Sequence, residues 1–175
     1  MTEMLSVHTS ADIDSVAALA RDIWTQHYVP IIGRAQTEYM LAKFQSAPAI
    51  ALQIADGYRY YLVLDKGTRA GYFAIVPNPS ERSALLSKIY VRQDRRRAGL
   101  GKRIMDFVEE RCVELGLREL WLTVNRNNAG SIAFYQHAGF TVSGTVVQDI
   151  GNGFVTSIRP HLCTLGLPEL ASTCV

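Results

Sequence analysis

The spacing of apolar residues predicts three helices in the first third of the chain. The first begins after the cap residue Ser10 and keeps an apolar face at intervals of three and four residues. Pro30 and Gly33 break this pattern, and two shorter helices are predicted at Thr37–Phe44 and Pro48–Ala55. The apolar face of the first helix consists of Ile13, Val16, Ala17, Ala20, Ile23 and Trp24.

Runs of β-branched and aromatic residues then predict three strands. Tyr58–Leu64 and Ala70–Val76 flank a tight turn, and a third run over Ala84–Val91 is apolar enough for a buried strand. From Leu100 the apolar residues return to a helical spacing, which predicts a long helix that Gly116 stops.

Strands and helices alternate in the rest of the chain. A strand at Glu119–Asn125 is followed by a helix and then by a strand at Phe140–Ile150. A last strand begins at Phe154–Ile158, and a short first strand is expected at Leu5–Val7.

These elements predict a single domain over residues 1–175 in the α/β (α+β) class. Strand 119–125 follows a helix after a short loop, so we expect it to lie parallel to strand 84–91. The other strands are joined mostly by short connections and are expected to be antiparallel. The result is a central mixed, mostly antiparallel sheet with helices on both faces.

Composition and charge exclude several classes of protein. Of 175 residues, 48% are hydrophobic and 19% are charged, which is ordinary for a globular protein. A net charge of +2 gives no general attraction to nucleic acid or membranes, and no apolar run approaches the length of a membrane span. Cys112, Cys163 and Cys174 are odd in number and lack metal-ligand spacing. We therefore expect a cytoplasmic protein with no disulfide framework and no metal.

A basic turn with two glycines lies between strand 84–91 and the long helix. A helix start offers unpaired backbone N–H groups and the positive end of a dipole, and glycines let a ligand approach them. With the arginines, this predicts a diphosphate site, although a solvated basic turn is the plain alternative. The spacing fits neither the dinucleotide-binding fingerprint nor a Walker loop. The turn consists of Arg95, Arg96, Arg97, Ala98, Gly99, Leu100, Gly101 and Lys102.

Two motifs, in this order, resemble the GNAT superfamily of N-acetyltransferases. Arg96-x-x-Gly99-x-Gly101 is similar to the family's pyrophosphate loop, which follows the fourth strand and grips coenzyme A. The second is similar to the family segment after the fifth strand. With the preceding hairpin, the resemblance covers residues 58–150, and residues 160–175 are expected to form an irregular tail. The second motif reads Asn128-x-x-Ser131-x-x-Phe134-Tyr135-x-x-x-Gly139-Phe140.

The resemblance implies that acetyl-CoA is the co-substrate and lies between fourth and fifth strands that splay apart. The backbone of Ile89 and Val91 would then contact the pantetheine arm and polarise the acetyl carbonyl. Tyr135, otherwise a core residue, matches the family's acid, because a phenol of pKa about 10 keeps its proton until the thiolate leaves. The implied cofactor-binding residues are Ile89, Val91, Arg96, Arg97, Ala98, Gly99, Gly101, Lys102, Asn128 and Ser131.

The sequence does not identify the group that takes a proton from the amine. Many family members carry a glutamate on the fourth strand, but the run from Ala84 to Tyr90 has no carboxylate. An amine of pKa about 10 must lose a proton before it attacks a thioester. Cys112 lies on the apolar face of the long helix and is read as core. The residues that could help are Glu38, Glu81, His137 and Asp149.

Two further stretches resemble the PaiA-like branch of the superfamily, the spermidine/spermine N-acetyltransferases. They are Tyr39-Met40-Leu41 and the run from Gln148 to Phe154. A small-molecule primary amine, with polyamines first, is therefore the expected acceptor. The acidic residues that this branch carries after Val155 are missing, and Pro160 argues against a long central strand there.

Other acceptors and partners stay open. A protein N-terminus, a lysine or an amino-acid-like amine is the alternative acceptor, and a non-catalytic acetyl-CoA-binding regulator is a further alternative. Three arginines in one turn, without a basic face, favour no nucleic-acid partner. A monomer and a homodimer are both compatible with the sequence. The candidate substrate contacts are Trp24, Tyr28, Glu38 and Asp149, of which the aromatic pair also fits core packing.

Overall fold

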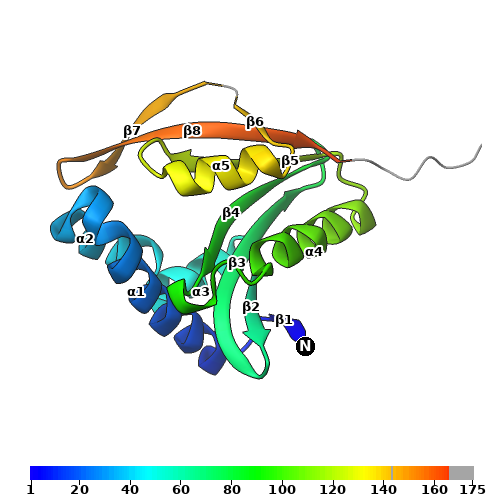
Figure 1. The fold of residues 1–175 in the computed structure, drawn as a ribbon, viewed down its shortest axis with the longest axis horizontal. Helices are drawn as coiled ribbons and strands as arrows, with labels where there is room; N and C mark the ends of the chain where they lie inside the picture. The colour runs from blue at the N-terminus through cyan, green and yellow to red at the C-terminus, as the bar shows by residue number, and fades with distance from the viewer. Residues whose placement is uncertain (143, 166–175) are drawn as a thin grey trace, which may run out of the picture.

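The computed structural model describes residues 1–142 and 144–165, and within them strands alternate with helices after an initial block of three helices (Figure 1). In chain order the elements are β1 (Thr2–Ser6), α1 (Ser10–Ile32), α2 (Arg34–Phe44), α3 (Ala47–Ala55), β2 (Arg59–Asp65), β3 (Thr68–Asn78), β4 (Ser83–Val91), the 3-10 turn η1 (Gln93–Arg95), α4 (Leu100–Glu114), β5 (Glu119–Asn125), α5 (Ala129–His137), β6 (Thr141–Val142), β7 (Val146–Gly151) and β8 (Phe154–Thr164).

The strands form one mixed sheet in the order β1-β2-β3-β4-β5-β8-β6, and β7 also pairs with β8. Among the described strands, the pair β4–β5 is parallel and the other pairs are antiparallel. Helices α1, α2 and α3 pack on one face, and α4 and α5 pack on the other (Figure 1). The predicted fold class and the parallel arrangement of β4 and β5 are therefore confirmed.

Two hydrophobic clusters, one on each face, explain why β2 and β3 are buried over most of their length without alternation. Tyr60 and Leu62 of β2 face α1 and its neighbours, whereas Tyr61 and Val63 face α4. Successive strand residues point to opposite faces, so a strand that is covered on both sides has no polar alternation. The sheet is thus held between two helical layers.

The start and end of α1 differ from the prediction. Thr9, rather than Ser10, is the N-cap, and it forms a capping box with Asp12 in which each side chain accepts a hydrogen bond from the other's backbone. Helix α1 also continues through Pro30 to Ile32, and Gly33 is its C-cap. Pro30 is exposed and lies in the last turn of the helix, which ends within three residues. Proline lacks a backbone N–H, so at this position it costs one hydrogen bond.

The C-terminal strands are also corrected. The run predicted as one strand, 140–150, forms β6 and β7 instead, and β8 extends to Thr164 through the stretch 160–164 that was expected to be irregular. Pro160 is tolerated in β8 because β6 pairs from His161 onward and β7 pairs up to Ile158, which leaves Pro160 between the two flanking partners. Residues 166–175 of the expected tail lie outside the described residues.

Helix α2 docks on the turn between β7 and β8. The Tyr39 hydroxyl and the Lys43 ammonium both donate to the Ile150 carbonyl, at 2.9 and 2.6 Å, and the Tyr39 ring lies 5.4 Å from that of Phe154. Gly151 has a φ of +91°, and a Cβ there would lie 2.6 Å from the Tyr39 hydroxyl. The two stretches that resemble the PaiA-like branch therefore contact each other.

Replacing Gly151 with alanine should lower the free energy of unfolding by about 1–3 kcal/mol, because the new methyl group overlaps Tyr39. Gly153→Ala is the matched control in the same turn, since its φ is also positive, at +75°, but no atom lies within 4 Å of its Cβ. Urea denaturation of both variants separates contact from backbone strain. Equal losses in the two would contradict the close approach.

Candidate active site

The inner edges of β4 and β5 separate after a short parallel pairing. The two strands pair at Ser83–Glu119, Ala84–Leu120 and Leu85–Trp121 and no further along the described chain. On their outer edges β4 pairs with β3 up to Val91, and β5 pairs with β8 up to Asn125. Each strand is held by its outer neighbour, so the predicted splay is confirmed and the sheet opens between them.

A β-bulge at Ser87 marks the opening on β4. The register with β3 skips this residue, because Ala74 pairs with Lys88 and Ile75 with Leu86. A bulge bends its strand and reverses which face later side chains point to. Beyond it, Lys88 and Tyr90 face α1 and α3, while Ile89 packs on the α4 side.

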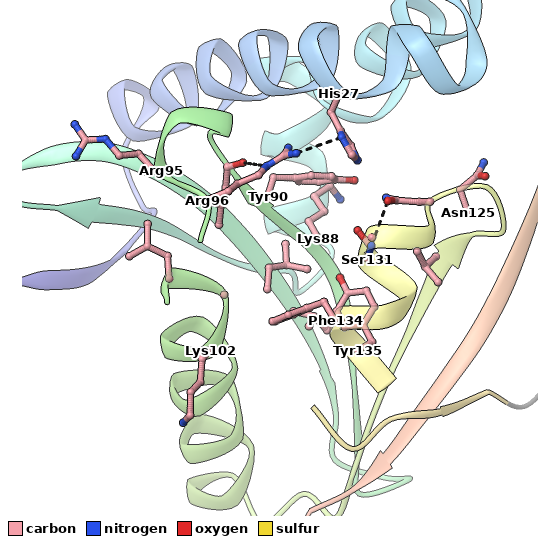
Figure 2. A pocket seen from close by; sticks show the side chains of 18 of the residues that line it. His27, Lys88, Tyr90, Arg95, Arg96, Lys102, Asn125, Ser131, Phe134 and Tyr135 are labelled. Carbon is pink, nitrogen blue, oxygen red and sulfur yellow. Dashed lines mark hydrogen bonds between the residues drawn. The ribbon is translucent and has the colours of Figure 1, made fainter. Parts of the chain in front are cut away.

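A cavity of about 600 Å³ lies between the two strands. Figure 2 shows its walls: β4 on one side, α5 and the end of β5 on the other, the turn before α4 at one end, and α1 above. All the residues that the resemblance implies for a cofactor lie on this wall, except Ala98, which is in the same turn. The structure thus brings together residues from five separate elements.

The turn before α4 presents backbone groups to the cavity. Arg97 and Gly99 both have positive φ, at 63° and 76°, and Gly99 is the N-cap of α4. The first N–H groups of a helix have no intrahelical partner, and together with the positive end of the helix dipole they are suited to an anion. Gly101 has a second role, because a Cβ there would lie 3.0 Å from the Phe134 ring of α5.

The basic side chains of this turn point in different directions. Arg96 reaches across the mouth of the cavity, where its Nε donates to the Val91 carbonyl at 3.1 Å and its Nη1 lies 3.4 Å from Nδ1 of His27. Lys102 points along α4 and pairs with Asp106 at 2.7 Å (Figure 2). Arg95 pairs with Asp65. Lys102 therefore offers the cavity its backbone rather than its charge.

Helix α5 supplies the second predicted motif. Asn128 is the buried N-cap and accepts a hydrogen bond from the Ser131 N–H at 3.3 Å through its side-chain oxygen. Tyr135 is buried between Phe134 and Phe140, and its pKa is raised because burial disfavours the phenolate. A phenol held in this way stays protonated at neutral pH and can donate a proton into the cavity.

Helix α1 contributes His27 and Tyr28 to the cavity, and Trp24 does not line it. The Trp24 ring is buried in the core against Tyr28 and Tyr90, with centroids at 4.4 and 5.5 Å. Burial, followed by the nearby Arg96 cation, lowers the pKa of His27, and a hydrogen bond with Asn128 acts in the opposite direction. Core packing, which the sequence favoured here over a substrate wall, holds for Trp24, whereas Tyr28 packs on the same cluster and also lines the cavity.

Lys88 is a buried cation in the cavity wall that sequence reasoning missed. Its ammonium donates to the Gln53 side-chain oxygen at 2.7 Å and lies over the rings of Tyr58 and Tyr60, at 5.1 and 5.3 Å. No ion pair with a carboxylate is found for it among the described residues. Burial lowers its pKa to about 8, so it is still mostly protonated at neutral pH.

The acidic candidates lie elsewhere. Glu38 is exposed and pairs with Arg34 at 3.8 Å, and Glu81 accepts from Asn78 in the β3–β4 loop. Asp149 accepts from the Gly151 N–H at 2.7 Å within the β7–β8 turn. Neither these residues nor His137 appear among the described residues of the cavity wall, which include no carboxylate. Cys112 is buried in the core, where burial raises its pKa to about 11.

The described part of the chain lacks two further features. No group of three or more His, Cys, Asp or Glu side chains is placed to hold a metal ion. None of the helices in residues 1–142 and 144–165 combines the length and apolarity needed to cross a membrane.

Comparison with known proteins gives the family. The model of the Acetyltransferase (GNAT) family matches residues 17–140, which is well over half of the chain. The chain therefore belongs to the GNAT acetyltransferase family.

Individual relatives are more distant. An L-methionine sulfoximine/L-methionine sulfone acetyltransferase of Pseudomonas paraeruginosa is 33% identical over 42% of this chain and 42% of its own length. The [ribosomal protein bS18]-alanine N-acetyltransferase of Escherichia coli is 37% identical over 49% of this chain and 57% of its own length. The match thus spans about half of these relatives.

Solved structures share the fold. The crystal structure of a PaiA N-acetyltransferase from Thermoplasma acidophilum, in complex with coenzyme A, superposes with a TM-score of 0.73. The likeness covers 91% of this chain and 98% of that one at 18% identity. At this level of identity the likeness shows a common fold and leaves the acceptor undetermined.

Substituting Gly101 with valine should weaken coenzyme A binding at least tenfold, about 1.4 kcal/mol, because the side chain crowds the start of α4 and Phe134. Titration calorimetry on the folded variant measures this. Adding Phe134→Ala makes room for the valine. If the double variant regains affinity, packing caused the loss. Unchanged affinity in Gly101→Val would exclude this turn as the binding site.

Proposed function

We propose that this acetyltransferase moves the acetyl group of acetyl-CoA to a primary amine by direct attack of the amine on the thioester. The opening between β4 and β5 carries the proposal. It has an anion-binding turn at one end and a buried phenol on its wall. The family match supports acetyl transfer, and the coenzyme A complex of the PaiA neighbour supports the choice of cofactor.

In this proposal the cofactor's diphosphate lies on the turn from Arg96 to Lys102 and its pantetheine arm follows β4. Beyond Leu85 the inner edge of β4 lacks a pairing with β5, so backbone groups near Ile89 can bind the arm and polarise the acetyl carbonyl. The Val91 carbonyl already accepts from Arg96. The amine forms a C–N bond, the C–S bond breaks, and Tyr135 donates a proton to the leaving sulfur.

The acceptor is inferred from the charge of the cavity wall. A polyamine, which the sequence favoured, carries several positive charges, but the described wall has no carboxylate to receive them. Lys88 precedes Ile89 and would repel a polycation next to the reacting carbonyl. An amino-acid-like amine with its own carboxylate would instead be attracted by Lys88. We therefore place the amino-acid-like amine first and the polyamine second.

Tyr135→Phe is the test of the chemistry, because it keeps the ring and its packing and removes the proton donor. We expect kcat to fall about 10²-fold, the low end for a positioned acid, while coenzyme A affinity changes little. Steady-state rates and direct titration of the cofactor measure the two effects. A wild-type kcat would reduce Tyr135 to a core residue, and a loss of affinity alone would make it a binding contact.

Lys88→Met is the test of the acceptor class, since it preserves length and removes the charge. With an α-amino acid as acceptor, kcat/KM should fall at least about tenfold, the loss expected for one hydrogen bond to a charged group. An alkylamine that lacks a carboxylate is the matched control, and Lys88→Met should not lower its kcat/KM. If the wild type acetylates spermidine and no amino acid, the acceptor is a polyamine and the proposed contact between Lys88 and a substrate carboxylate is wrong.

A further inference from the structure

His27 is a nitrogen base in the cavity with no role in the mechanism described so far. Figure 2 shows its imidazole pointing from α1 into the cavity, on the side of Tyr90 and Ser131. Its Nδ1 lies 3.4 Å from Nη1 of Arg96. The contact joins residues 69 positions apart, on opposite sides of the cavity mouth.

The attack of the acceptor amine on the thioester needs a base. An amine of pKa about 10 is protonated at neutral pH and cannot attack until it loses a proton. The described cavity wall has no carboxylate, and Lys88 itself holds its proton at neutral pH. Among the described side chains of the wall, His27 alone has an ordinary pKa near neutrality.

The contact with Arg96 fixes how His27 is held. A guanidinium donates hydrogen bonds and accepts none, so Nδ1 of His27 must be the acceptor and its lone pair is occupied. We propose that His27 is the base that takes the proton of the acceptor ammonium, and that Arg96 masks it until the cofactor's diphosphate draws the guanidinium away. The inference rests on the proposed function, because it requires acetyl-CoA in this cavity.

The protons balance as follows. The ammonium gives one proton to His27, and the neutral amine then uses its lone pair to form the C–N bond. The C–S bond breaks with its electron pair on sulfur. As the tetrahedral intermediate collapses, Tyr135 donates its proton to the sulfur and takes the second proton of the nitrogen in return. The imidazolium finally releases its proton to solvent, leaving an amide and a thiol.

The charges around His27 determine how the cofactor should change it. The Arg96 guanidinium is the charged group in contact, and Tyr28, Tyr90 and Tyr135 nearby are phenols whose pKa values burial raises, so they stay neutral. In the η1 turn, which packs on α1, the charge of Arg95 is paired with Asp65 and Asp94, and Asp94 also pairs with Arg92. Neutralising Arg96 with a diphosphate should therefore raise the pKa of His27.

Histidine NMR titration without and with coenzyme A tests the masking. The His27 signal, identified by its loss in His27→Gln, should titrate below its usual pH in the free protein and at a higher pH with coenzyme A. Arg96→Gln should raise it without the cofactor. The exposed His8, which is outside the described cavity wall, is the internal control, and its signal should not respond to coenzyme A. If coenzyme A binds and the His27 pKa stays fixed, masking is wrong; if coenzyme A does not bind, the proposed function fails instead.

The pH dependence of turnover tests the proton transfer. His27→Gln keeps an acceptor for Arg96 but cannot carry a proton, so kcat should fall about 10²-fold and the acidic limb of the kcat/KM profile should disappear. Its activity should recover as the pH approaches the pKa of the acceptor amine. His8→Gln is the matched control and should behave as the wild type. A His27→Gln enzyme with a wild-type pH profile would overturn the assignment.

Discussion

The parallel pairing of β4 with β5 ends after three residue pairs, and the rest of the site depends on that interruption. A buried sheet normally satisfies every backbone group with a neighbouring strand, so an edge that opens inside the molecule must find another partner. Here β3 and β8 hold the outer edges, the bulge at Ser87 bends β4 away, and the helices α4 and α5 fill only part of the gap. The cavity is thus a consequence of the backbone, and the side chains decide what it binds.

The local sequence pattern was sufficient to predict most of the fold. It was insufficient where contacts between distant segments determine the structure. Periodicity gave the helices and strands in order, and short loops gave the parallel pair, because both depend on neighbours in sequence. The course of β8 through Pro160 could not be read in this way, since it depends on where β6 and β7 end. The contact of Tyr39 with the β7–β8 turn also escaped, although both stretches had been noticed separately.

The same distinction applies to the residues of the site. Arg96, Gly99 and Tyr135 could be found because each belongs to a motif with fixed spacing in one strand–helix unit. His27 and Lys88 belong to no motif with a fixed spacing. His27 comes from α1, and Lys88 lines the cavity only because a bulge shifts the register of β4. A lone histidine or lysine in a sequence is ordinary, and burial without a carboxylate partner is what distinguishes these two.

The Ile150 carbonyl accepts hydrogen bonds from both Tyr39 and Lys43. It thereby links α2 to the β7–β8 turn on the side where the sheet is open (Figure 1). The half that carries β1 to β4 and the half that carries β5 to β8 are joined by three residue pairs of β4 and β5 at one end and by this contact at the other. One side of the opening is therefore held by backbone pairing and the other by hydrogen bonds from two side chains of α2. A substitution in α2 can thus alter the open side without changing the residues of the paired strands.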